Sequence, residues 1–193
     1  FDSIDTNSVV VDNYTGSYKA VEYLIKNGHK RIAIIQGLPN TSTNNMRVKG
    51  YKNALIKYNI EIDENLIVGN DYRRENGYIE TKLLLKMSNP PTAIFSTSDL
   101  ITLGTLDAII EEKLNVPQDV SLISFDDVDF APYLFTPLTA IQQPRQIMGE
   151  MAVKLLYDDL KSKGRKEKTR IELKPVLNIR KSVRNLNSVI NPD

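Results

Sequence analysis

The chain has 193 residues, of which 41% are apolar and 25% are charged, a composition typical of one soluble globular domain or two small ones. Its net charge is +1, so composition does not point to nucleic acid or an anionic membrane as a partner. The sequence has no cysteine, no run of 18 apolar residues and no visible signal peptide, so we expect no disulfide, zinc–thiolate site, cysteine nucleophile or transmembrane helix.

His29 is the only histidine, and it follows Gly28 at the expected end of a helix, where we expect a structural role. A hydrolytic triad or a two-histidine metal site would need partners that this sequence lacks. Neither G-x-G-x-x-G nor G-x-x-x-x-G-K-[ST] occurs, so nucleotide phosphates have no recognisable cradle. We therefore predict that the chain is not an enzyme and has no catalytic residue, metal or cofactor.

Apolar strands and amphipathic helices alternate along the first two thirds of the chain. Short runs rich in β-branched residues predict strands at 8–12, 31–37, 66–69, 93–96 and 120–125. Helical spacing predicts helices at 16–27, from about 43 to 58, and from 98 or 99 to about 112. A further helix follows the loop after Tyr72 and runs through Lys86. The alternation predicts an α/β fold with a parallel, doubly wound sheet, in which the helix near Thr43 turns Met46 and Tyr51 inward.

The pattern changes after Asp127. Residues 133–138 are apolar and marked by proline, and the sequence then predicts strands at 139–142, 171–175 and 176–180. A helix from 146 to about 161 should bury one apolar face, made of Ile147, Met151, Leu155 and Leu156. The basic segment 161–170 lacks the aromatic residues of a single-strand nucleic-acid binder, so we expect a solvated connector, and 185–193 should form a loose tail.

The strand at 120–125 ends in two carboxylates, Asp126 and Asp127. Ligands of an open parallel sheet bind just beyond the carboxyl ends of its strands, so Asp126 would offer a hydrogen-bond acceptor at the natural binding site. Two alternatives remain open. The pair can simply form a turn, or it can hold Mg²⁺ as in phosphoacceptor domains, which would also require a nearby lysine and a chain that begins at its first strand.

Other polar residues follow the remaining strand ends. The same rim should therefore gather Asp12, the loop 38–45, Tyr72, Ser98 and Asp126. Arg47 falls in the first turn of a helix, where a cation opposes the helix dipole, so its placement suggests a role beyond helix stability; the alternative is a solvated arginine. Tyr72 either stacks on a ligand or is a half-buried core tyrosine.

Four blocks of the chain, taken together, carry a family resemblance. They are residues 28–33 (GHKRIA), 47–51 (RVKGY), 91–95 with 98–99 and 103–104, and 116–127 (VPQDVSLISFDD), continued by 137–141 and 179–183. In order and spacing these blocks resemble the effector-binding domain of the LacI/GalR transcription factors. The resemblance covers nearly the whole chain.

The resemblance implies a periplasmic-binding-protein-like fold of type I, with two similar lobes and an effector in the cleft between them. This chain would hold one complete lobe plus part of the other. Residues 1–13 would end the first lobe, 14–141 would form the second, 142–172 would cross back to the first, 173–184 would be the final strands of the second, and 185–193 would be a tail. The remainder of the first lobe and a helix-turn-helix domain would lie outside it.

The resemblance also implies the site residues. Arg47 and Asp126 would hold ligand hydroxyls or a carboxylate, and Thr43 would occupy the polar position four residues before the arginine. Tyr72 would take an aromatic stacking position. Asp12 and Ser98 correspond to positions that contact ligand in some members only, and Ser98 stands where sugar-binding relatives carry asparagine.

The function implied by the resemblance is that of a cytoplasmic transcriptional regulator, typically a repressor of carbohydrate-utilisation genes. Its partners would be a small-molecule effector such as a sugar, operator DNA through the absent helix-turn-helix, and a second copy of the chain through 99–112 and 133–137, with no membrane partner. The alternative is a periplasmic or extracellular sugar-binding protein of a transport system. An upstream helix-turn-helix would support the regulator, and a secretion signal the transport protein.

Overall fold

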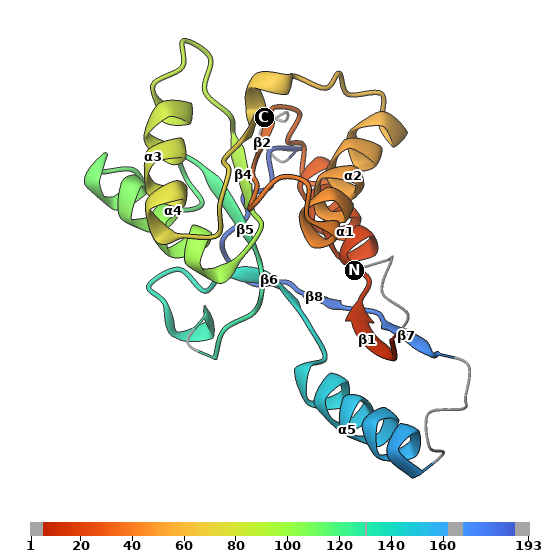
Figure 1. Ribbon diagram of the computed structural model, residues 1–193. Helices are drawn as coiled ribbons and strands as arrows, with labels where there is room; N and C mark the ends of the chain where they lie inside the picture. Colours follow the sequence, from red (N-terminus) through yellow and green to blue (C-terminus); the bar gives the residue numbers. More distant parts are fainter. Residues whose placement is uncertain (1–5, 130, 162–167, 188–193) are drawn as a thin grey trace.

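The computed structural model describes residues 6–129, 131–161 and 168–187 (Figure 1). The strands are β1 (Ser8–Val11), β2 (Ile32–Ile35), β3 (Ile67–Val68), β4 (Ala93–Ser96), β5 (Ser121–Phe125), β6 (Thr139–Gln142), β7 (Arg170–Leu173) and β8 (Val176–Asn178). The helices are α1 (Asn13–Lys26), α2 (Ser42–Lys57), α3 (Arg74–Leu85), α4 (Asp99–Glu111) and α5 (Arg145–Lys161), with short 3-10 turns at Glu64–Leu66 and Ala131–Tyr133.

Six strands form the main sheet in the order β3-β2-β4-β5-β6-β8, parallel except for β8, which runs antiparallel to β6. Side chains alternate between its two faces along each strand. Ile32 and Ile34 pack under α1 and α2, while Ala33 and Ile35 pack under α3 and α4. The helices thus cover both faces (Figure 1), and the expected parallel, doubly wound α/β architecture is confirmed.

One strand expected in that sheet lies elsewhere. β1 pairs in parallel with β7, with Val9 opposite Ile171, and the two form a separate two-stranded sheet. A β-branched run indicates a strand but not its partner, so the assignment of all early strands to a single sheet was wrong. Figure 1 shows this small sheet below the main one, on the side of α5.

The apolar face predicted for α5 is only partly covered by the described chain, since Met151 and Leu155 are half-buried beside β1. No residue of α5 is buried, and Ile147 and Leu156 are 46% and 60% exposed. Met46 of α2, which was expected to face inward, is also exposed, whereas Tyr51 is fully buried as expected. Within the described ranges, no helix is both long enough and apolar enough to cross a membrane.

Asp127 belongs to the scaffold of the fold. Arg180 donates to both of its carboxylate oxygens at 2.8 Å, and Asn178 donates to one of them at 2.7 Å. Burial acts to raise the pKa of Asp127, but these hydrogen bonds outweigh it, so the pKa lies below its ordinary value. The carboxylate is therefore engaged in fixing the last strand beside β6, which argues against a magnesium site, and the described residues contain no metal-binding cluster of three or more histidine, aspartate or glutamate side chains.

We expect Arg180→Ala to lower the free energy of unfolding by about 3–5 kcal/mol, because it leaves a buried carboxylate unpaired. A carboxyl with a depressed folded-state pKa stabilises the fold above its unfolded pKa, about 3.9, and loses this contribution as pH falls through the folded pKa. Urea titration of the parent and Arg180→Ala should therefore show their difference shrinking in acid. Arg73→Ala, at an exposed ion pair, is the control. An equal stability of Arg180→Ala and the parent at neutral pH would contradict the assignment.

Candidate functional site: a polar cavity between the two sheets

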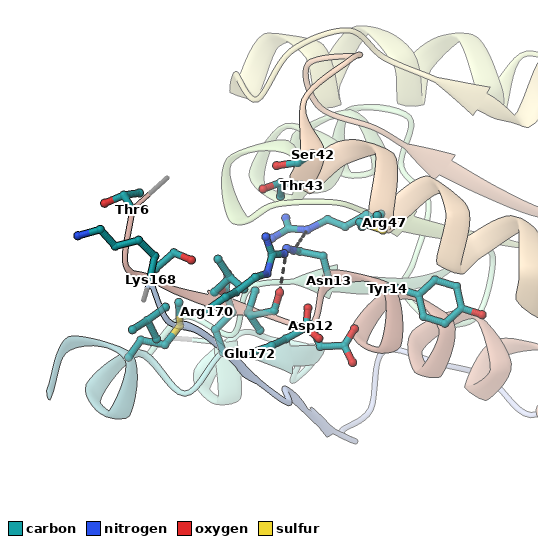
Figure 2. A pocket seen from close by; sticks show the side chains of 17 residues that line it. Thr6, Asp12, Asn13, Tyr14, Ser42, Thr43, Arg47, Lys168, Arg170 and Glu172 are labelled. Carbon is teal, nitrogen blue, oxygen red and sulfur yellow. Dashed lines mark hydrogen bonds between the residues drawn. The ribbon is translucent and has the colours of Figure 1, made fainter. Parts of the chain in front are cut away.

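A cavity of about 830 Å³ lies between the start of α2, the start of α1 and the two-stranded sheet β1–β7 (Figure 2). The residues most important for its chemistry are Asp12, Asn13, Thr43, Arg47 and Gln143. Met46 and Met148 also line it, as do Lys168, Arg170 and Glu172 from the β7 segment. The walls therefore combine charges of both signs with some apolar surface, which suits a small polar ligand.

Arg47 is the most deeply buried charge of the cavity wall, with 4% of the residue exposed. Its Nε donates to the Asn13 side chain at 2.8 Å, its Nη1 donates to the Thr97 carbonyl, and its guanidinium carbon lies 3.6 Å from the centre of the Phe125 ring. Burial lowers its pKa, and the nearby Asp126 carboxylate acts in the opposite direction. The reading of Arg47 as a solvated arginine is therefore wrong.

Asp126 follows β5 with a backbone φ of 87°, a left-handed conformation that few residues other than glycine adopt. Its Oδ1 accepts a hydrogen bond from Gln143. Burial raises its pKa, partly offset by Arg47 and Gln143. Asp126 thus makes a turn and also places a buried carboxylate within electrostatic range of Arg47, yet the two side chains form no direct ion pair.

The structure brings together three of the six predicted site residues on the cavity wall. Thr43 and Arg47 line it from α2, and Asp12 lines it while its Oδ1 caps α1 by accepting from the Thr15 amide at 2.8 Å. Asp126 does not line the cavity, but its partner Gln143 does. These residues converge from separate strand ends, as expected for an open parallel sheet.

The other two predicted residues lie apart from this cavity. Ser98 is buried and its hydroxyl caps α4 by accepting from the Ile101 amide at 3.3 Å. Tyr72 lines a second hollow of about 480 Å³, together with Thr43 and the residues just before it. Its ring packs on Gly37, where any Cβ would lie 2.1 Å from the ring. Its hydroxyl is buried and has no hydrogen-bond partner among the described residues.

Two residues of the site, Asn13 and Gln143, were not predicted from the sequence. Each provides a side-chain amide that bonds to one of the two charged groups. A usable signal existed in both cases, because Gln143 directly follows β6, as Asp126 follows β5, and Asn13 lies two residues after the end of β1. Applying the strand-end rule to polar residues as well as charged ones would have found them.

Comparison with known proteins agrees with this architecture. The family "Periplasmic binding protein-like domain" matches residues 21–183. The chain belongs to the periplasmic-binding-protein-like domain family. Its relatives in this family include LacI-family transcriptional regulators, as the sequence resemblance predicted.

One such relative is the HTH-type transcriptional repressor PurR of Histophilus somni (strain 2336), 37% identical over 182 residues, which are 94% of this chain and 54% of the relative. Among solved structures, a LacI transcriptional regulator from Bacillus cereus subsp. cytotoxis NVH 391-98 has a TM-score of 0.88 and 32% identity, covering 93% of this chain and 63% of that one. The transcriptional regulator CelR–cellobiose complex has a TM-score of 0.86 and 31% identity, and the match covers 92% of this chain and 54% of that one. The chain thus spans about half the length of such relatives.

The geometry predicts that the ionisation of Asp126 depends on Arg47. Replacing Arg47 by methionine removes the positive charge that lowers the pKa of Asp126, so this pKa should rise further above its ordinary value. Carbon-detected NMR titration of the carboxyl groups can measure it. Arg73→Met, a change at an exposed arginine, should leave the Asp126 titration unchanged. Identical Asp126 curves for the parent and Arg47→Met would show that the two groups do not interact.

Proposed function

We propose that this chain is the effector-binding part of a LacI-type transcriptional regulator and that its cavity binds a small polar metabolite. The observation that carries the proposal is the pair formed by Arg47 and Asp126. Both groups are desolvated, they lie within electrostatic range, and they do not bond to each other. A charge shielded from water and bonded only to neutral groups is costly. A ligand that bonds to Arg47 on the cavity wall, and to Asp126 in place of Gln143, would therefore gain from their desolvation.

The chemistry of the two groups favours adjacent hydroxyls on the ligand. A guanidinium offers a planar fork of donors, and a carboxylate offers acceptors. Each hydrogen bond to a charged group contributes about 1.5–3 kcal/mol. Thr43 and Asp12 add further polar contacts on the same wall. The cellobiose in the CelR structure, a neighbour in fold, supports a sugar as the effector class.

The incomplete surfaces of the chain support the domain division implied by its family. The sheet β1–β7 has only two strands, and the apolar side chains Ile147, Leu156 and Leu160 of α5 are exposed. We propose that residues 1–13 and 142–172 belong to a first lobe completed by chain outside the sequence, and that 14–141 and 173–184 form the second. The described part of the proposed tail, 185–187, is bonded to the end of α1, where Leu186 donates to the Asn27 carbonyl at 2.8 Å.

In this proposal the effector acts by selecting one arrangement of the two lobes. A ligand shifts that equilibrium only by its difference in affinity for the two arrangements. A DNA-binding domain outside the chain would then respond to occupancy of the cavity, which is coupling between distinct sites. Relatives named as repressors favour this function, in the cytoplasm, over that of a transport binding protein.

We expect Arg47→Ala and Asp126→Ala each to weaken effector binding at least tenfold, because each removes charged hydrogen bonds worth about 1.5–3 kcal/mol. A thermal-shift screen of mono- and disaccharides on the full-length protein would provide the ligand, and calorimetry the affinities. Asn45→Ala, an exposed change on the same helix as Arg47, is the matched control. Parent-like affinity in both site variants would remove the assignment.

We also propose a homodimer formed through α4 and residues 133–137, where Ile110, Tyr133 and Phe135 are 71%, 86% and fully exposed. We infer an association site there because these large apolar side chains are exposed to solvent. Sedimentation velocity should show a dimer for the parent and a monomer for Phe135→Asp. Ile56→Asp, equally apolar and exposed on α2, should remain dimeric. A monomeric parent at high concentration would contradict this interface.

A further inference from the structure

Three segments connect the two sheets, and two of them contribute residues to the cavity wall. They run from β1 to α1 (residues 11–13), from β6 to α5 (142–145) and from β7 to β8 (173–176). Any change in the relative orientation of the two sheets must be absorbed here, since these are the only covalent links between them in the described chain. Residues on these segments are therefore placed to sense the state of the site.

The first connection is bonded to the buried cation. The Asn13 Oδ1 accepts from Arg47 Nε at 2.8 Å, and the Asn13 Nδ2 donates to the Val11 carbonyl at 3.1 Å. One side-chain amide thus joins the guanidinium to the last residue of β1, and Figure 2 shows Asn13 facing Arg47. The other two guanidinium nitrogens differ in their hydrogen bonding. Nη1 is bonded to Thr97, whereas no described residue accepts a hydrogen bond from Nη2.

The second connection is bonded to the buried anion. Gln143 donates from its Nε2 to the Asp126 Oδ1, and it lines the cavity that Asp126 itself does not reach. Two residues further on, Arg145 donates to the Asp127 carbonyl at 3.0 Å, so the same segment is held at neighbouring points of the chain. Arg47 and Asp126 are therefore held in the same way, each by a side-chain carboxamide from a different connecting segment.

We propose that Asn13 and Gln143 are positioning residues that tie Arg47 and Asp126 to the connections and thereby hold the β1–β7 sheet and α5 in one orientation to the main sheet. An effector that bonds to the Arg47 Nε or to the Asp126 Oδ1 competes with Asn13 or Gln143 for the same hydrogen bond. Its binding loosens the carboxamide ties and changes the preferred orientation. This inference rests on the proposed function for the role of the effector, but the ties themselves exist without any ligand.

The ties can be tested on the unliganded chain, so that their failure would leave the proposed effector site standing. Because the chain has no cysteine, two can be introduced for spin labels without removing any. Lys49→Cys on α2 and Lys154→Cys on α5 are both exposed. Pulsed electron–electron double resonance then measures the distribution of distances between the two spin labels. We expect a single narrow population in the labelled parent, and a broadened or shifted one in Asn13→Ala and in Gln143→Ala.

The variant Gln143→Glu distinguishes two causes of a broadened distribution: loss of the hydrogen bond to Asp126 and loss of the packing of the Gln143 side chain. At neutral pH it replaces the donor by a second carboxylate next to Asp126, so the distribution should broaden as in Gln143→Ala. In acid, the two carboxyl groups share a proton and an O–H···O bond replaces the lost tie. Asp126 is also faced by Arg47 of α2, Asp99 of α4 and Arg145 of α5, and these three residues are the same in both Gln143 variants. The narrow population should therefore return at about pH 5 in Gln143→Glu but not in Gln143→Ala.

Two exposed changes serve as matched controls, Gln118→Glu for the added charge and Asn45→Ala for the lost amide. Both should give the parent distribution at each pH, and circular dichroism should confirm that every variant remains folded. Parent-like distributions in Asn13→Ala and Gln143→Ala would overturn the proposal. So would a parent without a single population, or a Gln143→Glu distribution that does not respond to acid.

Discussion

The constraint on which the site depends is the burial of the Arg47 charge. A guanidinium removed from water is tolerated only where acceptors and polarisable groups surround it. Here Asn13 supplies an amide oxygen, Thr97 a backbone carbonyl and Phe125 the face of its ring. These three groups come from the start of α1, the end of β4 and the end of β5. The cation can therefore be buried only if neighbouring strands end together, which the parallel register of β2, β4 and β5 ensures.

Local patterns were sufficient to predict most strands of the main sheet and the helices that cover it. The bounds of β4 and β6 match those expected, because a buried parallel strand is a short apolar run with sharp polar ends. What local patterns cannot provide is the strand partner. β1 has the composition of a core strand but pairs with β7, about 160 residues away. The apolar stripe of α5 was expected to be buried, but the described chain covers it only in part, at Met151 and Leu155.

The site was predicted in part, for reasons that follow from charge. Arg47 stood out because it was expected in the first turn of a helix, where a cation opposes the dipole, and Asp126 because a carboxylate ends an apolar strand. The helix α2 begins earlier, at Ser42, so Arg47 lies in its second turn and that expectation was wrong. Asn13 and Gln143 also stand at strand ends, but they are uncharged and common on surfaces, so the prediction based on charged groups did not include them. Ser98 was expected both at the start of a helix and among the ligand-contacting residues. In the structure its hydroxyl accepts from the Ile101 amide and so caps α4. A residue that can satisfy a backbone amide locally is a weak candidate for a ligand contact.

The balance of charge around the cavity bears on the kind of effector that fits the proposal. Burial raises the pKa of Asp126 and lowers that of Arg47, and in each case the opposite charge acts against the effect of burial. An anionic ligand bonded to Arg47 would place a second negative charge beside Asp126 and favour protonation of that carboxyl. A neutral polyol leaves both charges intact and supplies the donor and the acceptor that each lacks. The pair of buried charges is thus better matched to a neutral, hydroxyl-bearing effector than to an acid, and the mixed signs of Asp12, Arg170 and Glu172 on the cavity wall add no strong bias toward an anion.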